Sequence, residues 1–443
     1  MGRSARCCRA CLPGLAKKQL LHFRPDTSKV LELLPETARI EDGELALGGL
    51  RASELAKRRG TPLVVYCEET VRTQARAYAH AAPGALVVYG TKAFPNVALL
   101  RLLAGEGLGA DVSTRGELEF ALRAGVSGER IVFHGNNKSD EELGAAAAAG
   151  ALVVLDALDE AARAKAAGVE TVLIRLTPGI EAETHRAVQT AHAESKFGLV
   201  ADDAVAAVRD ATAAGLDVAG LHVHIGSQLT RSAESLLAVE RLVDVALLCR
   251  AELDWVPRVF DLGGGLAVRH TLAETVPAPE EFARDLLVRL RQHWTEPARV
   301  IFEPGRSLIG TAGFTLYRVG VVKRTIGVAY AAVDGGMSDN PRPQLYGSRY
   351  EALLANRADE AAAGTYRIAG KHCESGDVLI DSVELPTPHR NDLLAVPATG
   401  AYTLAMASNY NGVPRPAAVL VADGHAELIR RRESLDDLLA FET

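Results

Sequence analysis

Short apolar runs alternate with amphipathic segments between residues 86 and 303 of the chain. Segments 116–125 and 203–215 show the apolar spacing of helices, and the runs between such segments have the length of buried strands. Strands that are covered on both faces appear as nearly continuous apolar runs, and eight strand–helix units close into a parallel barrel. The pattern therefore predicts an α/β protein with a (β/α)8 barrel. The eight runs span 86–89, 107–112, 130–133, 152–155, 172–176, 220–225, 258–262 and 299–302.

A ninth apolar run, 62–66, precedes these and leads into a predicted helix over 70–81; we place this run outside the barrel proper. After Gly310 the pattern changes to short β-rich pieces that are interrupted by Gly and Pro, which predicts a second domain resembling a β-sandwich. The hairpin-like stretch 39–49 has the same character. The expected organisation is an unassigned, disordered leader (1–27), an N-terminal segment of the β domain (28–61), the cofactor-binding barrel (62–310) and the C-terminal β domain (311–443).

Charge and hydropathy narrow the class of partner. The 443 residues include 49 basic and 56 acidic side chains, a net charge of −7, with both signs interspersed. This balance of charges does not indicate a basic surface that would bind nucleic acid or an anionic membrane, so we expect a small-molecule partner. The longest uncharged apolar stretch, 143–155, is shorter than the ~20 residues that a membrane helix needs. The basic first residues lack the apolar core of a signal peptide, which favours a cytoplasmic protein.

Polar residues follow the predicted strands at the end where barrel enzymes place their chemistry. A scaffold alone does not require so many converging polar groups. In strand order these residues are Lys92, Asp111 with Ser113, His134, Asp156, Arg175, His224 with Ser227, Gly263 to Gly265, and Glu303 with Arg306.

Three of these positions suggest a cofactor. The glycines 263–265 allow backbone N–H groups to approach a phosphate, and Arg306 adds a fixed cation. Lys92 follows an apolar strand, where burial is expected to lower the pKa of its ammonium and free an amine that condenses with an aldehyde. Glu303 could face the nitrogen of a pyridine ring and keep that ring a strong electron sink. His222 and His224 alternate on one strand face as metal ligands do, but no third ligand follows nearby, so we expect no metal.

From about residue 30 to 425 the sequence resembles the diaminopimelate decarboxylase family, whose enzymes use pyridoxal 5′-phosphate. The common order and spacing of many motifs make the resemblance specific. The motifs are GTKAF (90–94), GADVSTRGEL (109–118), FHGNNKS (133–139), SKFG (195–198), LHVHIGSQ (221–228), DLGGGL (261–266), EPGRSLIGTAG (303–313), VDGGMSDNPRPQLYG (333–347), HCESGD (372–377) and TGAYTLAMASNYNGVPRPA (399–417). The leader matches nothing in the family, and GTKAF replaces a commoner ending in Asn.

The resemblance implies an alanine-racemase-like barrel with a β domain, in a homodimer whose active sites form across the interface. It gives Lys92 the role of the Schiff-base lysine and Cys373 that of a proton donor from the second subunit. The positions that match cofactor contacts are Lys92, Asp111, His224, Ser227, Gly263, Gly264, Gly265, Glu303, Gly305, Arg306 and Tyr402. The positions that match substrate contacts are Arg306, Arg342, Tyr346, Glu374 and Tyr402.

The implied reaction is decarboxylation of meso-2,6-diaminopimelate to L-lysine and carbon dioxide, the last step of lysine biosynthesis. Arg342 could bind the distal carboxylate of this substrate bidentately. Other hypotheses are a decarboxylase of ornithine, arginine, carboxynorspermidine or a substrate of specialised metabolism, an alanine-racemase-type enzyme, and a catalytically inactive regulator with the same fold. A racemase is expected to place an arginine where this chain has Glu303, and retention of Lys92, Glu303 and Cys373 argues against an inactive relative.

Overall fold

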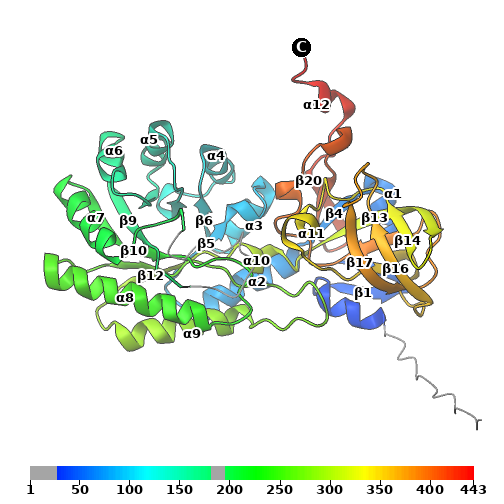
Figure 1. Ribbon diagram of the computed structural model, residues 1–443, viewed down its shortest axis with the longest axis horizontal. Helices are drawn as coiled ribbons and strands as arrows, with labels where there is room; N and C mark the ends of the chain where they lie inside the picture. The colour runs from blue at the N-terminus through cyan, green and yellow to red at the C-terminus, as the bar shows by residue number, and fades with distance from the viewer. Residues whose placement is uncertain (1–26, 181–194) are drawn as a thin grey trace, which may run out of the picture.

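The computed structural model describes residues 27–180 and 195–443, which form a helix-covered barrel beside a β-rich part (Figure 1). The predicted leader lies outside the described residues except for Thr27. The barrel is closed, in the strand order β10-β11-β12-β5-β6-β7-β8-β9, and all its pairings are parallel. Each of the eight predicted runs contributes one strand, and the (β/α)8 prediction is confirmed. The strands are β5 (Leu86–Gly90), β6 (Gly109–Val112), β7 (Ile131–Phe133), β8 (Leu152–Leu155), β9 (Thr171–Leu176), β10 (Asp217–Val223), β11 (Val259–Asp261) and β12 (Arg299–Phe302).

Helices surround the barrel, as their apolar spacing predicts, and several begin at local caps. Ser139 and Glu142 form a capping box at the start of α5, and the side chains of Asn96 and Thr114 cap α3 and α4. The helices are α2 (Glu68–Ala81), α3 (Val97–Gly105), α4 (Arg115–Arg123), α5 (Asp140–Ala149), α6 (Glu160–Ala166), α7 (Ala201–Ala213), α8 (Ala233–Leu253), α9 (Pro279–His293) and the short α10 (Arg306–Ile309).

The barrel strands are buried on both faces, and successive residues alternate between two apolar clusters. In β5, for example, Leu86 and Val88 pack inside the barrel, whereas Val87 and Tyr89 pack against the helices. The inner cluster contains Leu86, Val88, Val132, Val154, Leu173, Ala219 and Ile301. This inner layer fills the barrel and fixes which residues face its open mouth.

The second part is built on a nine-stranded sheet in which β13 (Gly313–Arg324) connects two groups of strands. The ninth apolar run forms β4 (Leu63–Cys67), which pairs with β13 and β19 and with no barrel strand. By its hydrogen bonds β4 belongs to this sheet, although the sequence analysis groups it with segment 62–310. The other strands are β14 (Ala329–Val333), β15 (Leu353–Leu354), β16 (Gly364–Ala369), β17 (Val378–Leu385), β18 (Leu393–Val396), β19 (Ala417–Ala422) and β20 (His425–Arg430).

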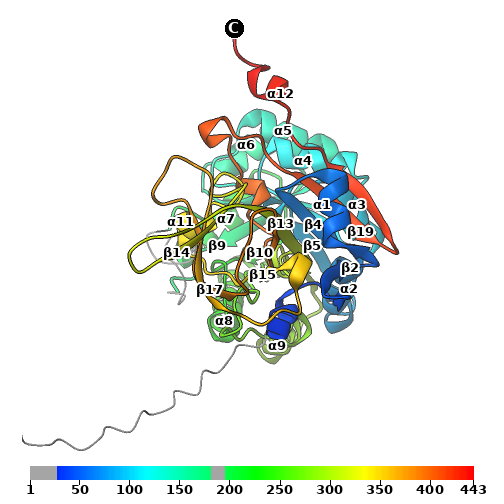
Figure 2. The same cartoon turned by 90° about the vertical axis from the view of Figure 1, so that its right-hand side faces the viewer.

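The N-terminal segment packs onto this sheet, as Figure 2 shows. After a 3-10 helix (Thr27–Leu33), it forms a small antiparallel sheet of β1 (Ala38–Glu41), β2 (Glu44–Leu47) and β3 (Leu50–Arg51), followed by α1 (Ala52–Arg59). Asp42 and Gly43, with φ values of 50° and 79°, make the β1–β2 turn, which is the backbone that a two-residue hairpin favours.

Two short helices complete the described chain. The first, α11 (Arg342–Tyr346), lies in the β-rich part, and the second, α12 (Leu435–Leu439), projects from the body of the molecule near the C-terminus (Figure 1). Within the described residues, none of the helices combines the length and the apolar character needed to cross a membrane.

Candidate active site

The alternation along the barrel strands places a layer of polar side chains directly above the apolar interior. His134 and Arg175 lie two residues beyond the interior residues Val132 and Leu173. Because strand residues repeat every second position, these polar groups face the barrel mouth. The same step from an interior residue leads to Asp156, Asp261 and Glu303.

In β10 a pairing irregularity adjusts this alternation. The register with β9 shifts between Val218 and Gly220, so that His222 lies opposite Arg175. The next inward position is His224.

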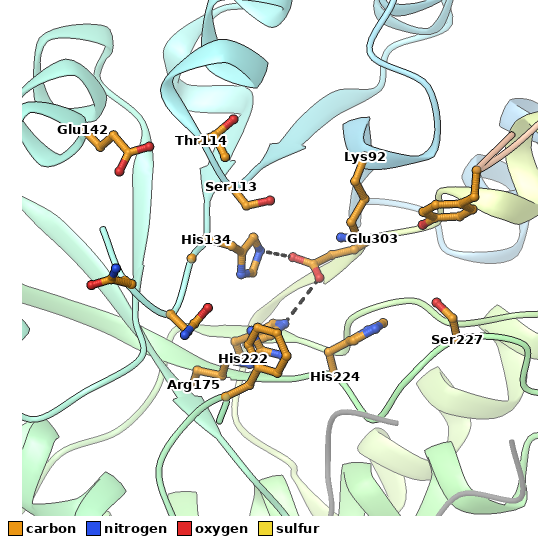
Figure 3. A pocket seen from close by; sticks show the side chains of 15 residues that line it. Lys92, Ser113, Thr114, His134, Glu142, Arg175, His222, His224, Ser227 and Glu303 are labelled. Carbon is orange, nitrogen blue, oxygen red and sulfur yellow. Dashed lines mark hydrogen bonds and ion pairs between the residues drawn. The ribbon is translucent and has the colours of Figure 1, made fainter. Parts of the chain in front are cut away.

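These residues surround a cavity of about 510 Å³ at the carboxyl ends of the strands. Figure 3 shows Lys92 and Glu303 on one side of the cavity, with His134 and His222 beside Glu303. The cavity is lined by Lys92, Ser113, Thr114, His134, Gly135, Asn136, Asn137, Glu142, Arg175, Phe197, His222, His224, Ser227, Glu303 and Tyr402. Five of the residues proposed from the sequence therefore meet here: Lys92, His224, Ser227, Glu303 and Tyr402.

Lys92 lies in a 3-10 turn (Thr91–Ala93) that follows β5, and its side chain is 45% exposed because it faces the open cavity. Its Nζ donates to Oδ2 of the buried Asp111 at 2.7 Å. Burial by itself lowers the pKa of the ammonium, but the negative charges of Asp111 and Glu303 and the nearby Tyr402 raise it above its usual value. The expectation of a lowered pKa is therefore wrong for the protein alone, because the sequence did not show how closely two carboxylates approach this lysine.

Glu303 is buried between two imidazoles. His134 Nε2 lies 2.5 Å from Oε1, and His222 Nε2 lies 3.3 Å from Oε2. Burial tends to raise the pKa of Glu303, but the two histidines outweigh it and hold the pKa well below its usual value. Burial also lowers the pKa of His222 to about 4, so at neutral pH its neutral ring donates from Nε2 to the ionised carboxylate.

Asp261 is buried beside Glu303, His134 and His222. Burial, with the charge of Glu303 close by, raises the pKa of Asp261 well above its ordinary value. The ligand atoms of His134, His222, Asp261 and Glu303 lie within 4.8 Å of one another, a spacing that a metal ion could also use. The absence of a metal stays a prediction.

The glycine run after β11 has a structural reason beyond phosphate binding. A Cβ on Gly263, Gly264 or Gly265 would lie 2.4, 2.2 or 2.3 Å from a backbone oxygen of a neighbouring segment. Glycine is therefore required for the barrel to close here. The Gly264 N–H points to His224 Nδ1 at 3.3 Å, which connects the glycine run to the cavity wall.

Arg306 lies at the start of α10, buried beneath Tyr402, with its guanidinium carbon 4.4 Å from the centre of that ring. Burial and the nearby Arg342 lower the pKa of Arg306 to about 9, so it stays a cation at neutral pH. Within the described residues, its Nε and Nη1 have no hydrogen-bond partner. Buried donors of this kind suit an anion.

Tyr402 comes from the β-rich part and reaches the cavity in a left-handed conformation, with φ of 58°. Its N–H donates to Ala93 O at 2.8 Å, and a Cβ on Gly305 would lie 3.3 Å from its hydroxyl oxygen. The two parts of the chain thus meet beside Lys92.

Arg342 provides a second buried guanidinium, in α11. It donates to the Tyr350 hydroxyl at 2.9 Å and to Ser348 Oγ at 3.1 Å, and its carbon lies 5.8 Å from the Tyr346 ring centre. Arg342 and Arg306 are close enough for each charge to affect the other.

Cys373 and Glu374 are exposed and do not line the cavity that Lys92 faces. The Cys373 N–H donates to Asn411 Oδ1 at 2.9 Å, which fixes its loop but not its thiol. Arg342 and Tyr346, also predicted from the sequence, are likewise absent from the lining of this cavity.

The set of site residues drawn from the sequence missed several side chains, among them His134, Arg175, His222, Asp261 and Phe197. His134 and Arg175 were noted only as polar strand ends. Counting two residues on from the inner apolar positions would have identified His134, Arg175 and Asp261, whereas His222 depends on the register shift in β10 and Phe197 lies on a connecting segment.

Comparison with known proteins assigns the chain to a family. A family model described as the pyridoxal binding domain of pyridoxal-dependent decarboxylases matches residues 68–310. A diaminopimelate decarboxylase of Actinosynnema pretiosum subsp. auranticum is 45% identical over 421 residues, which cover 93% of this chain and 95% of the relative. The chain belongs to the diaminopimelate decarboxylase family.

Other relatives agree. The diaminopimelate decarboxylase of Bacillus subtilis (strain 168) is 41% identical over 422 residues, covering 91% of this chain and 96% of the relative. The crystal structure of diaminopimelate decarboxylase from M. jannaschii in co-complex with L-lysine superposes with a TM-score of 0.86 at 32% identity, covering 92% of this chain and 98% of that one. This family uses pyridoxal phosphate, and it is the cofactor of this chain.

The cavity fits this cofactor. Lys92 supplies an amine, ionised Glu303 an acceptor for a protonated ring nitrogen, and Arg306 two buried N–H donors for an anionic group. Among the described residues, these groups have the chemistry that an aldehyde, a pyridine nitrogen and a phosphate each require.

Proposed function

We propose that this chain decarboxylates meso-2,6-diaminopimelate to L-lysine and carbon dioxide, the last step of lysine biosynthesis. The observation that carries the proposal is the joint placement of Lys92 and ionised Glu303 on one cavity, above the imidazoles that keep Glu303 charged. The co-complex of the M. jannaschii relative with L-lysine supports this choice of product.

The protein's own groups then have distinct tasks. Bound pyridoxal phosphate supplies an electron sink for the pair left when the substrate's Cα–carboxylate bond breaks. Lys92, whose amine faces the cavity, is the residue that would hold the aldehyde group of the cofactor. Glu303 holds a proton at the ring nitrogen, while His224 lines the cavity where it can pack on the ring. Asp111 remains beside Lys92 to accept from its amine.

Phosphate binding is assigned to Ser227, the glycines 263–265, Gly305 and Arg306. Ser227 lines the cavity, and Gly264 is linked to it through His224. The unpaired donors of Arg306 support an anion at this end. Tyr402 covers the Arg306 guanidinium and separates it from water.

Substrate choice is assigned to the arginines together with Tyr346 and Glu374. Diaminopimelate has a second carboxylate, which ornithine and lysine lack, and a buried cation left without it would be costly. Arg342, already oriented by Tyr350 and Ser348, is suited to recognise that carboxylate. A related decarboxylase of another amino acid is the second candidate, and the same cavity would serve it.

We further propose that the enzyme is a cytoplasmic homodimer in which Cys373 and Glu374 come from the partner chain. The exposure of both residues, away from the Lys92 cavity of their own chain, supports an intermolecular role. The Cys373 thiol would give its proton to the substrate Cα after carbon dioxide leaves, which completes the reaction's proton balance.

The test is to compare the wild-type protein with Lys92→Ala after both are loaded with pyridoxal phosphate. We expect the wild type to show the visible absorbance of an amine-bound cofactor and to release carbon dioxide from meso-diaminopimelate. Lys92→Ala should lose that absorbance and at least ~10³-fold of the activity. Parallel assays with ornithine, arginine and lysine test the substrate. Release from one of these and not from diaminopimelate would overturn the assignment.

A further inference from the structure

We propose that Lys138 is a positioning residue for this reaction, which acts through His134 on Glu303 and makes no contact with substrate. This inference rests on the proposed function, because it gives Glu303 the task of holding the ring nitrogen's proton. In the sequence Lys138 stands in the motif FHGNNKS (133–139) with no role of its own assigned. The structure places it beneath the cavity wall.

Lys138 is completely enclosed. Its Nζ donates to Gly135 O at 2.5 Å and lies 3.0 Å from Glu160 Oε1. The side chain of Lys138 has no exposed area, and that of Glu160 has 3%. A buried ion pair gains little net stability, because desolvating two charges offsets their attraction. Its value here is therefore geometric: it fixes the position of the Gly135 carbonyl.

Gly135 directly follows His134, so fixing its carbonyl fixes the imidazole that holds Glu303. The backbone of Gly135 has φ of +124°, and a Cβ there would lie 3.2 Å from both Lys138 Cγ and Ser113 O. This path of the loop therefore favours glycine at position 135, where Lys138 and Ser113 pack close to the backbone. His134 Nε2 then lies 2.5 Å from Glu303 Oε1.

The same ion pair is connected to the next two strands of the barrel, β8 and β9. Glu160 Oε2 accepts from the Asp156 N–H at 2.6 Å, and Asp156 Oδ1 accepts from the Gly198 N–H at 2.7 Å. Asp156 Oδ2 lies 3.3 Å from Arg175 Nη1, and the Arg175 guanidinium lies over the ring of Phe197, which lines the cavity. Glu160 is thus anchored to the Arg175 side of the cavity, and Lys138 positions the His134 loop against it; a small displacement of His134 lowers the rate markedly.

The test compares Lys138→Met with Lys165→Met as holoenzymes. Lys165 is a matched control, because its Nζ also donates to a backbone carbonyl, that of Gly215 at 2.7 Å, but on an exposed surface outside the cavity lining. For Lys138→Met we expect retained cofactor absorbance, a fall in kcat of about 10–100-fold, KM within about twofold, and a displaced kcat–pH profile. Lys165→Met should match the wild type in all four measurements.

A double variant tests the route. If Lys138 acts through His134, then Lys138→Met in a His134→Gln background should lower kcat by less than about twofold further. If the fold losses in kcat of the two single variants multiply in the double variant, the proposed route through His134 is wrong. If Lys138→Met alone leaves kcat and its pH profile unchanged, the whole proposal is overturned. Glu160→Gln, which removes the charge but keeps an acceptor for the Asp156 N–H, provides the same test if Lys138→Met does not fold. A wild-type protein without cofactor absorbance or carbon dioxide release would instead contradict the proposed function.

Discussion

At the scale of single residues, the arrangement of protons around Glu303 decides what the cavity can do. Two carboxyl groups, those of Glu303 and Asp261, lie in one buried group, and their pKa values move in opposite directions. The histidines lower the pKa of Glu303, while burial beside that charge raises the pKa of Asp261. A single ionised acceptor is thereby prepared for a protonated ring nitrogen, which a pair of equivalent carboxylates could not provide.

Another buried carboxyl, that of Asp339, allows a prediction about stability. Asp339 accepts from the Tyr317 hydroxyl at 2.5 Å and from the Gly336 N–H at 2.8 Å, yet burial raises its pKa from 3.8 to about 7. The folded state therefore binds the proton more tightly than the unfolded state. The contribution of Asp339 to the free energy of unfolding must fall as pH rises from about 4 to about 7, by on the order of 4 kcal/mol.

Asp339→Asn removes this titration while keeping an acceptor oxygen. The difference in Tm between the variant and the wild type, measured by calorimetry, should shift in favour of the variant as pH rises from 5 to 7.5. Tyr330→Phe serves as a control that should show no such trend. Tyr330 lies in β14, next to the strand that carries Tyr317, and is only half-buried. A pH-independent difference for Asp339→Asn would contradict the raised pKa.

At the scale of elements, the barrel strands show how much a local pattern predicts. All eight apolar runs became barrel strands, and the 70–81 helix became α2 with an earlier start at Glu68. After Gly310 the pattern predicted short β-rich pieces but not how they pair, because strands as short as β15 and β18 carry little periodic signal. Which strand each of them pairs with depends on the edges that the other strands of the folded sheet leave free.

Close contacts between neighbouring barrel segments predict a difference between two glycines. A Cβ at Gly264 would lie 2.2 Å from Glu303 O, whereas nothing lies within 4 Å of a Cβ at Gly144 in α5. Gly264→Ala should lower the free energy of unfolding by more than about 2 kcal/mol and weaken cofactor binding, because the segments must move apart. Gly144→Ala should raise it by up to about 1 kcal/mol. Urea unfolding of both cofactor-free proteins measures the two effects; equal changes would argue against the close contact.

At the scale of the whole molecule, the site depends on parts that are distant in sequence. Tyr402 reaches the barrel mouth from the β-rich part and is held there by the carbonyl of Ala93. β4 connects the parts, since it pairs within the second sheet and leads directly into α2 of the barrel. The position of the β-rich part relative to the barrel therefore determines where Tyr402 lies in the wall of the cavity.

Mixing two inactive variants tests the proposed contribution of a partner chain. Lys92→Ala and Cys373→Ala should each be nearly inactive. If Cys373 acts across a dimer interface, an equal mixture that exchanges subunits should recover up to about a quarter of wild-type activity, because half the dimers are hybrids with one intact site. Gel filtration of each variant checks that the oligomeric state is unchanged. No recovery after complete subunit exchange would place Cys373 in its own chain's reaction or outside the reaction.

The sequence by itself determined the barrel, the strand ends that carry Lys92 and Glu303, and the family, because alternation and motif spacing are local properties of the chain. The tertiary structure was needed to show that His134 and His222 contact Glu303, that Lys138 donates to the carbonyl of Gly135 beside His134, and that Tyr402 covers Arg306. These relations arise when the barrel closes and the register of β10 shifts. Burial then sets which group keeps its proton, and the burial of a side chain depends on neighbours that are distant in sequence.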